Sequence, residues 1–457
     1  MNPITSHTDT IIAPATPQGI SALAVIRLSG EQAIPLAARI FSGKDLKTLP
    51  SHRVAVGFIK DGDRIVDEVV VTIFRKPKSY TREDMVEISC HGSPVVVREI
   101  INLFIRLGAR LAGPGEFTKR AFLNGRIDLT QAEAVADIIH AETENARQAA
   151  MNQMRGGFSK EINRLREELI EFASLIELEL DFAEEDVEFA RRDELKNLVL
   201  RILAFVEKLI ASFASGNVIK NGIPTVIAGK PNAGKSTLLN ALLNEERAIV
   251  SDIPGTTRDT IEDEITIGGL LFRFIDTAGL RHTTDVIEAQ GVERTRQYMK
   301  RASLILYLID LTQATEEEVK AQEEELRSLH IPYILIGNKT DKLTASEIER
   351  WKKFPMVFIS AAAGKNLDEL KQRILNNFLI KQIKTGDVLV TNARHYQSLV
   401  ETREALKRVL EGLDQQISGE LLAFDIRQAQ YHLGQITGSI TTEDLLDSIF
   451  SRFCIGK

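Results

Sequence analysis

The segment 229–236, with the sequence GKPNAGKS, constrains the fold of this 457-residue chain more than any other feature. It follows an apolar, strand-like run that ends at Ala228, and it precedes a helical pattern over residues 237–243. Glycines let backbone N–H groups approach a phosphate, and the positive end of the following helix favours the same anion. This context predicts a phosphate-binding loop, in which Lys235 reaches the β- and γ-phosphates and Ser236 ligates Mg²⁺.

A second motif, DTAG at residues 276–279, lies at the end of a predicted strand. The carboxylate of Asp276 suits a second contact to Mg²⁺, and the amide of Gly279 is expected to face the γ-phosphate. Between this motif and the phosphate loop lies GTTRD, at residues 255–259. A threonine in this segment can bind Mg²⁺ when the γ-phosphate is present, and we predict that Thr257 is this ligand.

A third motif, NKTD at residues 338–341, concerns the base. The carboxylate of Asp341 can accept hydrogen bonds from N1–H and the 2-amino group of guanine, whereas adenine offers an acceptor at that edge and lacks the amine. A site that loses such pairs can discriminate by about 10⁴ to 10⁵. SAA at residues 360–362 follows the next predicted strand and resembles the loop that supports the base. Four motifs in this order predict a site for GTP rather than ATP.

The pattern of strands and helices divides the chain into four stretches. Residues 222–383 alternate strand-like runs with helical segments, which predicts a mainly parallel sheet covered on both faces. Residues 123–221 and 384–457 show helical periodicity, and residues 1–122 are rich in strands. We expect an α/β and α+β multidomain protein, in which a Ras-like P-loop GTPase domain is inserted into an all-helical domain and preceded by a strand-rich α+β domain.

The net charge of −7 argues against a chain that wraps nucleic acid, although a local basic patch could still bind RNA. The two cysteines, Cys90 and Cys454, are too few for a disulfide framework and lack metal-ligand spacing, so we expect a reducing compartment. Cys90, at the end of a short strand, is more typical of a structural position than of a nucleophile. No signal peptide is expected, because the N-terminus has no basic region followed by an apolar one. No membrane span is expected, because the longest apolar runs have the length of a strand. These features predict a cytoplasmic protein without a membrane partner.

The residue after the DTAG motif is Leu280, where many GTPases have a glutamine that orients the attacking water. Leucine cannot hydrogen-bond to water, and the nearby Arg258 and Arg281 also fit ordinary surface residues. The negative charge that develops during phosphoryl transfer still has to be offset. Asn232, inside the phosphate loop, has a side-chain carbonyl oxygen that could ligate a monovalent cation beside the phosphates.

The motifs GKPNAGKS, GTTRD and DTAGLR together resemble those of the potassium-activated, dimerising GTPases. The last four residues, CIGK, and the order of the domains narrow the resemblance to the MnmE (TrmE) family of bacterial and organellar tRNA modification GTPases. The resemblance spans essentially the whole chain. It implies that residues 1–122 form a folate-binding and dimerisation domain like that of folate-dependent aminomethyltransferases.

For the nucleotide site, the resemblance implies further roles. The implied Mg²⁺ ligands are Ser236 and Thr257, and the implied K⁺ ligands are Asn232, Ser251, Ile253 and Thr256. Glu288, in the second switch, would orient the attacking water through another water molecule and would act in catalysis with Lys235. Ser251 departs from the family, which often has threonine there. The residues expected to contact GTP are Asn232, Ala233, Gly234, Lys235, Ser236, Thr237, Ser251, Asp252, Ile253, Pro254, Gly255, Thr256, Thr257, Asp276, Thr277, Ala278, Gly279, Asn338, Lys339, Asp341, Ser360, Ala361 and Ala362.

In the N-terminal domain, the residues that match the family's folate site are Arg27, Glu87 and Arg126. A carboxylate can bind the pterin donors, and arginines can hold carbonyl or glutamate groups. The implied ligand is a tetrahydrofolate derivative, in its 5-formyl or 5,10-methylene form. Cys454 would be a functionally required thiol that the dimer brings near the folate. From the residues alone, each charge also fits an ordinary surface group, and Cys454 a bystander thiol.

The resemblance implies a cytoplasmic homodimer that couples GTP hydrolysis to tRNA modification. Proteins of this family add an aminomethyl or carboxymethylaminomethyl group at C5 of the wobble uridine, with a one-carbon unit from methylene folate. They work with MnmG, a flavoprotein that binds FAD and uses NADH. Two other classes stay open: a ribosome-assembly GTPase acting as a binding switch, and a signalling GTPase that needs an external activating protein.

Overall fold

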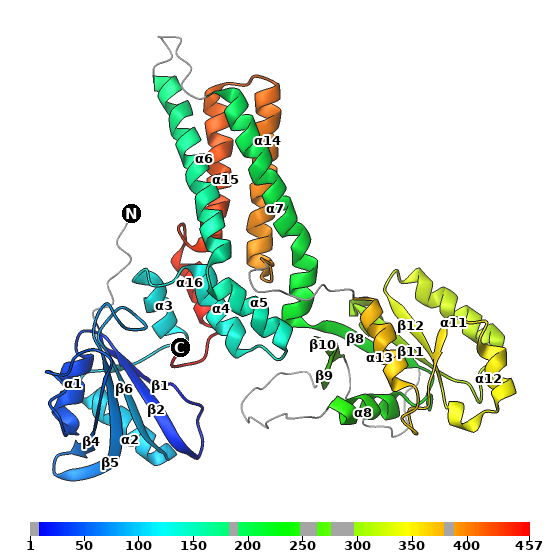
Figure 1. The fold of residues 1–457 in the computed structure, drawn as a ribbon, viewed down its shortest axis with the longest axis horizontal. Helices are drawn as coiled ribbons and strands as arrows, with labels where there is room; N and C mark the ends of the chain where they lie inside the picture. Colours follow the sequence, from blue (N-terminus) through cyan, green and yellow to red (C-terminus); the bar gives the residue numbers. More distant parts are fainter. Residues whose placement is uncertain (1–8, 182–190, 247–262, 276–296, 379–387) are drawn as a thin grey trace. The chain divides into compact units, whose positions relative to one another are not determined.

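The computed structural model describes residues 9–181, 191–246, 263–275, 297–378 and 388–457 (Figure 1). Contacts within the chain divide it into two compact units. The first comprises Met1–Ile139, Gln153–Val206 and Gln397–Lys457, and the second comprises His140–Asn152 and Glu207–Tyr396. The expected division of the chain into domains at residues 122, 221 and 383 stays a prediction.

The first unit contains a seven-stranded sheet of order β3-β4-β5-β6-β2-β1-β7. Its strands are β1 (Ile11–Pro14), β2 (Ser21–Ser29), β3 (Phe41–Ser42), β4 (Arg53–Asp61), β5 (Arg64–Phe74), β6 (Met85–Gly92) and β7 (Arg110–Leu111). Neighbouring strands are antiparallel, except that β1 and β7 are parallel. This sheet confirms the strand-rich character of the N-terminal stretch.

One face of this sheet packs against helices, and at β4 and β5 the other face exposes apolar side chains. The helices of this region are α1 (Ala33–Ile40), α2 (Pro94–Arg106) and α3 (Glu116–Leu123). Helices α1 and α2 share one buried cluster with the strands, in which Phe104 is fully buried. On β4, the alternate side chains of Val54, Val56 and Phe58 are exposed, and Val56 stands opposite the exposed Val70 of β5. We call these four residues the apolar strip.

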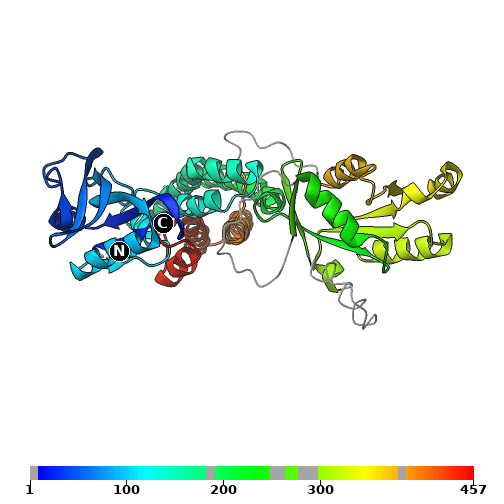
Figure 2. The same ribbon diagram turned by 90° about the horizontal axis from the view of Figure 1, so that it is seen from below.

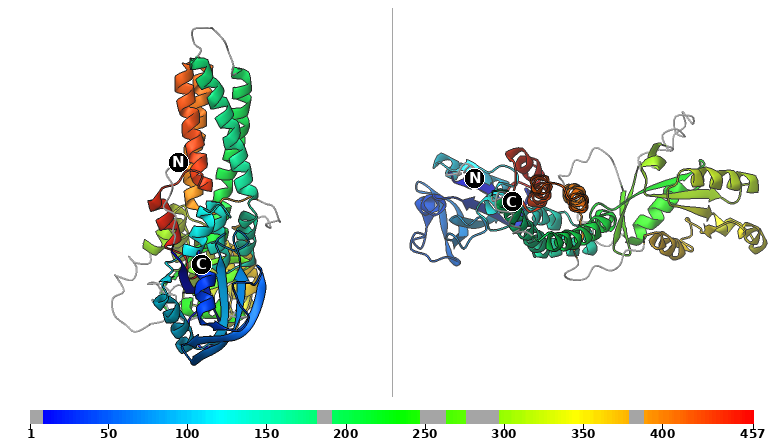
Figure 3. Two further views of the ribbon diagram at one scale, coloured as in Figure 1. Left: turned by 90° about the vertical axis from the view of Figure 1, so that its left-hand side faces the viewer. Right: turned by 90° about the horizontal axis from the view of Figure 1, so that it is seen from above.

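The remainder of the first unit is helical. Its helices are α4 (Leu129–Ile139), α6 (Gly157–Asp181), α15 (Gly419–Thr437) and α16 (Glu443–Phe450). Three more helices continue from one unit into the other: α5 (Glu144–Met154), α7 (Arg192–Asn221) and α14 (Ala393–Asp414). Within the first unit, α6, α7, α14 and α15 lie side by side (Figures 1 and 3). Among the described residues, no helix is both long enough and apolar enough to cross a bilayer.

The second unit contains a six-stranded sheet of order β13-β12-β11-β8-β10-β9. Figure 2 shows strands of this unit with helices beside them. Its strands are β8 (Ile223–Gly229), β9 (Asp263–Ile267), β10 (Leu270–Phe274), β11 (Leu304–Asp310), β12 (Tyr333–Asn338) and β13 (Met356–Phe358). All neighbours are parallel except β9 and β10, which are antiparallel. The helices that follow the strands are α8 (Lys235–Glu246), α11 (Glu316–Ser328), α12 (Ala345–Trp351) and α13 (Leu367–Asn376).

Strand β11 shows why this sheet is covered on both faces. Leu304, Leu306 and Leu308 belong to a buried cluster that includes residues of α8 and α13. The residues between them belong to a second cluster, which includes residues of α11 and α12. A strand buried on both sides reads as a continuous apolar run, because neither face meets water. The predicted mainly parallel, doubly covered sheet is confirmed.

Candidate functional site

The phosphate loop lies between β8 and α8, as its sequence predicts. The backbone is left-handed at Asn232 (φ 62°) and at Gly234 (φ 99°). The Nζ atom of Lys235 donates hydrogen bonds to the carbonyl oxygens of Gly229 (2.8 Å) and Lys230 (2.9 Å). Burial lowers the pKa of Lys235, since removal from water disfavours an ammonium. A phosphate seated on the loop would stabilise this ammonium by supplying a counter-charge.

Asn338, the first residue of the NKTD motif, joins the phosphate loop to the loop that supports the base. Its Nδ2 atom donates to the carbonyl oxygen of Ala233 (2.8 Å), and its Oδ1 atom accepts from the amide of Ala361 (3.0 Å). The Asn338 side chain is buried, and an amide bonded at both ends in a low-dielectric interior fixes what it joins. Asn338 therefore holds the two loops in register.

A side chain at Gly234 would disturb the contact between Asn338 and the phosphate loop. A Cβ atom on Gly234 would lie 2.4 Å from Nδ2 of Asn338, and φ at Gly234 is in the region that favours glycine. We expect Gly234→Ala to displace Asn338 and to weaken fluorescent GDP binding about tenfold or more, because an unmade buried hydrogen bond costs about 1–3 kcal/mol. Gly62→Ala is the control, since Gly62 also has a positive φ but open space around it. Equal affinities for the two variants would contradict this role of Asn338.

Asp341 lies in the short 3-10 helix η2 (Thr340–Lys342), directly after β12. Its Oδ1 atom accepts a hydrogen bond from Oγ of Ser360 at 2.5 Å, and this bond lowers the pKa of Asp341. Ser360 Oγ in turn accepts from the amide of Ala363 at 3.2 Å. The Asp341 side chain is exposed, so a guanine can reach it. The loop that was predicted to support the base therefore orients the carboxylate that is predicted to read the base.

Lys339 makes a contact that its motif alone does not predict. Its Nζ atom donates to Oδ2 of Asp310, the last residue of β11, at 2.6 Å. Burial works against ionisation of Asp310, but hydrogen bonds from Lys339 and Thr312 keep the pKa of Asp310 below its ordinary value. An acid at the carboxyl end of the neighbouring parallel strand is the signal that points to Asp310, because such strand ends line ligand sites in α/β sheets.

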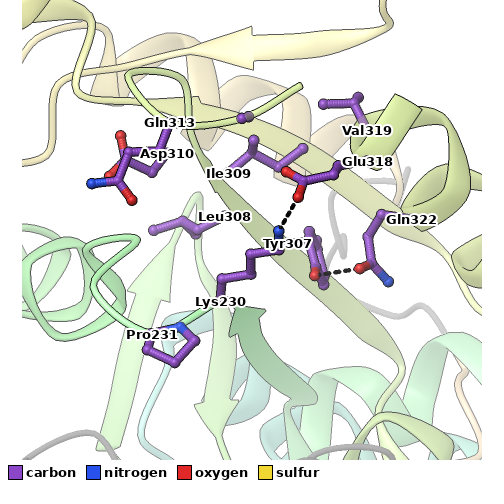
Figure 4. A pocket seen from close by; sticks show the side chains of 11 residues that line it. Lys230, Pro231, Tyr307, Leu308, Ile309, Asp310, Gln313, Glu318, Val319 and Gln322 are labelled. Atoms are coloured by element: carbon purple, nitrogen blue, oxygen red, sulfur yellow. Dashed lines mark hydrogen bonds and ion pairs between the residues drawn. The ribbon is translucent and has the colours of Figure 1, made fainter. Parts of the chain in front are cut away.

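A cavity of about 220 Å³ lies beside the phosphate loop (Figure 4). Lys230 and Pro231 line it from the loop, and β11 and α11 supply its other walls. The Nζ atom of Lys230 lies 2.7 Å from a carboxylate oxygen of Glu318, and the hydroxyl of Tyr307 donates to Gln322 at 2.6 Å. Burial raises the pKa of Tyr307 to about 12, so this hydroxyl stays protonated at neutral pH. Of the two lysines in the phosphate loop region, Lys230 is therefore the one that forms a salt bridge with α11.

Part of the expected nucleotide and metal site lies outside the described residues. This part comprises Ser251, Asp252, Ile253, Pro254, Gly255, Thr256, Thr257, Asp276, Thr277, Ala278, Gly279 and Glu288, whose roles stay predictions. Asn232 and Thr237 lie in the described part and are exposed, and Ser236 is half-buried in the first turn of α8. The structure therefore places the phosphate-loop members of the expected Mg²⁺ and K⁺ sites.

Arg27, Glu87 and Arg126 come together around Tyr80. Arg27 on β2 and Glu87 on β6 are cross-strand neighbours, with Nη2 and Oε1 2.8 Å apart. The guanidinium carbons of Arg27 and Arg126 lie 5.5 Å and 5.8 Å from the centre of the Tyr80 ring, within cation–π range. Arg126 also donates to the carbonyl oxygen of Ser79 and, with Glu87, lines a cavity of about 400 Å³. The three predicted residues thus form one cluster in the first unit.

The two cysteines differ in their surroundings. Cys90 is 1% exposed, and its Sγ atom lies 3.6 Å from the carbonyl oxygen of Ala24. Burial raises the pKa of Cys90 to about 11, which disfavours the nucleophilic thiolate. Cys454 is exposed, and its carbonyl oxygen accepts a hydrogen bond from the amide of Gly115. The expected structural position of Cys90 is confirmed, and Cys454 is the accessible thiol.

These contacts define the class of protein. A mainly parallel sheet carries a phosphate loop and an NKTD loop at the carboxyl ends of its strands, and Asn338 joins the two. Asp341 presents an exposed, hydrogen-bonded carboxylate at the position predicted to read guanine. A P-loop protein with this base-reading residue is a P-loop GTPase.

Comparison with known proteins narrows this class to one family. Residues 10–126 match the family described as GTP-binding protein TrmE N-terminus, and residues 129–454 match the MnmE helical domain. The chain is 58% identical to the tRNA modification GTPase MnmE of Cytophaga hutchinsonii over 99% of both chains. It is 52% and 50% identical to the proteins of that name from Christiangramia forsetii and Flavobacterium psychrophilum, over 98% of this chain and 99% of each relative. The chain belongs to the MnmE family of tRNA modification GTPases.

Proposed function

We propose that this GTPase couples GTP hydrolysis to modification of C5 of the wobble uridine in certain tRNAs. The product carries an aminomethyl or carboxymethylaminomethyl group, whose one-carbon unit comes from a methylene-tetrahydrofolate. The observation that carries the proposal is the joint presence, in one chain, of the Asn338–Asp341 guanine site and the Arg27–Glu87–Arg126 cluster. The full-length likeness to proteins named tRNA modification GTPase MnmE supports the tRNA as substrate.

For hydrolysis, we assign Mg²⁺ to Ser236 and Thr257, and K⁺ to Asn232, Ser251, Ile253 and Thr256. The donor chemistry fits, because Mg²⁺ and alkali ions prefer oxygen ligands. When bound, the two cations offset the negative charge that develops on the phosphates. The exposed Asn232 sits on a left-handed backbone inside the loop, and Lys235 adds its ammonium from the start of α8. Glu288 orients the attacking water in this proposal.

For the one-carbon unit, the cluster around Tyr80 is the proposed binding place of a tetrahydrofolate derivative. The cavity lined by Glu87 and Arg126 offers a carboxylate for the donors of a pterin and a guanidinium for its carbonyl or its glutamate tail. Arg27 holds Oε1 of Glu87 through a hydrogen bond from Nε (2.9 Å) and an ion pair with Nη2 (2.8 Å). A planar ring stacked by Tyr80 would complete the site.

The proposed working form is a cytoplasmic homodimer that acts with the FAD-dependent flavoprotein MnmG. The apolar strip of the N-terminal sheet supports self-association, because contiguous exposed apolar surface marks interaction sites. Val54, Val56, Phe58 and Val70 are 52%, 62%, 37% and 38% exposed, which is unusual for such side chains on a packed sheet. The strip therefore offers a surface for a second copy of this chain.

The test is nucleoside analysis of tRNA from a strain that lacks this protein. We expect the C5-modified wobble uridines to disappear in that strain, to return with the wild-type chain, and to stay absent with Cys454→Ser. Ser451→Ala, at an exposed position close by, is the matched control and is expected to restore the nucleosides. Unchanged wobble uridines in the deletion strain would remove the tRNA proposal, and co-sedimentation with ribosomes would then favour a ribosome-assembly GTPase.

A further inference from the structure

The loop after β12 is tied to both of the strands that flank β12. The strand order places β11 on one side of β12 and β13 on the other. On the β11 side, the Nζ atom of Lys339 donates to Oδ2 of Asp310, the last residue of β11, at 2.6 Å. On the β13 side, Oδ1 of Asp341 accepts from Oγ of Ser360, which lies just after β13. Lys339 and Asp341 are therefore held from opposite sides of the loop.

The contact between Lys339 and Asp310 is stronger than an ordinary surface ion pair. The side chains of Lys339 and Asp310 are 25% and 11% exposed. Those of Lys230 and Glu318, which also pair near the phosphate loop, are 65% and 46% exposed. Water screens an exposed pair, whereas a charge-assisted hydrogen bond strengthens as water is removed from around it. Asp310 therefore restricts the Lys339 side chain more than Glu318 restricts Lys230.

The Asp310 carboxylate is itself oriented. Its Oδ1 atom accepts from the amide of Thr312 at 3.0 Å and from the hydroxyl of Thr312 at 2.6 Å. Its Oδ2 atom is left for Lys339. Although burial raises the pKa of Asp310, the hydrogen bonds from Lys339 and Thr312 lower it overall, so the group is a carboxylate at neutral pH. Lys339 thus meets an anion whose direction is set by the start of the next loop.

The backbone sends the Lys339 side chain along the nucleotide site. Lys339 has φ 66°, a left-handed conformation that residues other than glycine adopt at a cost. It follows Asn338, which contacts the phosphate loop, and it precedes the base-reading position by two residues. Asp310, at the other end of the lysine, also lines the cavity beside the phosphate loop (Figure 4). The lysine stem therefore spans the part of the site between the base-reading loop and the phosphate loop.

We propose that Asp310 is a positioning residue of the guanine site, which acts by holding the Lys339 side chain along the nucleoside. With the ammonium paired to Asp310, the methylenes of Lys339 offer apolar surface to the purine and the ribose, because a lysine stem packs on apolar groups while its charged end is satisfied elsewhere. The phosphates are left to Lys235. This inference rests on the guanine site of the proposed function, but it does not depend on the modification of tRNA.

The variant Asp310→Asn tests this role in the full-length protein. The amide oxygen of asparagine can still accept from Thr312, whereas its N–H₂ group cannot accept from the Lys339 ammonium. We expect the affinity for GDP to fall about tenfold, which is the size of effect of one charge-assisted hydrogen bond. The affinity for a non-hydrolysable GTP analogue should fall by the same factor, because the phosphate contacts of Lys235 do not change. Competition against a fluorescent guanine nucleotide measures both affinities.

The matched control is Glu316→Gln, which removes another paired acid from the same unit. Glu316 lies in the first turn of α11 and accepts a hydrogen bond from Arg350 at 2.9 Å, away from the nucleotide motifs. We expect Glu316→Gln to bind GDP and the analogue as the wild type does. A comparable loss of affinity in Glu316→Gln would overturn the specific role of Asp310.

A second variant separates positioning from a structural role. Lys339→Met keeps an unbranched side chain but lacks the ammonium, so Asp310 has nothing to hold. If Asp310 acts through Lys339, adding Asp310→Asn to Lys339→Met changes the affinity by no more than about twofold, since both changes remove the same contact. If Asp310 acts on the fold through Thr312, the two losses multiply. Should the melting curve of Asp310→Asn show unfolding, an equal loss for GDP and the analogue in Lys339→Met supports the proposal.

Four results contradict the proposal, and one of them also contradicts the proposed function. Wild-type affinity in Asp310→Asn overturns the role of Asp310, and so do losses that multiply in the double variant. Unequal losses for GDP and the analogue overturn it as well, because they would place Lys339 at the phosphates. A wild type that binds ATP as tightly as GTP contradicts the guanine site of the proposed function and, with it, the role of Asp310.

Discussion

Replacing Asp341 by asparagine is expected to lower the affinity for GTP by about 10⁴-fold, because a buried polar pair with guanine is lost. The carboxylate accepts two hydrogen bonds from guanine, and the amide of asparagine would turn one acceptor into a donor that faces the 2-amino group. Xanthine carries a carbonyl oxygen at that position. We therefore expect Asp341→Asn to bind xanthosine triphosphate more tightly than GTP, measured by competition against a fluorescent nucleotide.

The control for this change is Asp368→Asn, an exposed aspartate in the first turn of α13. This variant makes the same change, from aspartate to asparagine, in the same unit. We expect it to leave the preference for GTP intact. In the structure, Asp341 is oriented by the hydroxyl of Ser360 and is open to solvent. The penalty for a wrong base therefore arises only when the base covers the carboxylate. Equal affinities of Asp341→Asn for the two nucleotides would contradict the assignment of the base-reading residue.

Replacing Asn232 by alanine is expected to slow GTP hydrolysis by about 10²- to 10³-fold, which is the size of effect when one electrostatic stabiliser of a transition state is removed. The wild type should hydrolyse GTP faster in K⁺ than in Na⁺, because the proposed cation site is fitted to the larger ion. In Asn232→Ala the two salts should give the same rate. Single-turnover hydrolysis in matched ionic strength measures both effects.

Asn232→Gly separates loss of the ligand from backbone strain. Asn232 has φ 62°, where alanine costs about 1–2 kcal/mol and glycine costs little. Both variants lack the amide oxygen, so both should lose the preference for K⁺. If only the alanine variant were slow, the cause would be distortion of the phosphate loop, and the proposed K⁺ ligand would be wrong.

The parts of the structure that the sequence predicts well are those with local signals. The phosphate loop can be recognised in the sequence from its glycines and from the strand and the helix that flank it. Strand β11 is recognisable because a strand buried on both faces reads as a continuous apolar run, here from Leu304 to Ile309. The period of the α6 helix likewise shows in Leu165 and Leu169, which are both buried. In each case, neighbours within a few residues determine the conformation.

The parts that escape sequence analysis depend on contacts between distant segments. Arg27 bonds the carbonyl oxygen of Gly456, which is 429 positions away, and no spacing rule connects the two. Lys339 pairs with Asp310 because β11 and β12 are parallel neighbours, a fact of strand order rather than of motif. The space for a side chain at Gly456 is likewise limited by β1 and not by the turn that contains Gly456. Pairing order and close approach become visible only in three dimensions.

In the proposed function, nucleotide bound at the guanine site of this chain drives modification of tRNA. The most direct test uses unmodified tRNA and a desalted extract from a strain that lacks the protein, supplemented with wild type or Asp341→Asn and with one nucleotide at a time. Mass spectrometry of the wobble uridine is the measurement. We expect modification with GTP for the wild type and with xanthosine triphosphate for Asp341→Asn. Modification by Asp341→Asn that still follows GTP, or that proceeds without any nucleotide, would contradict it.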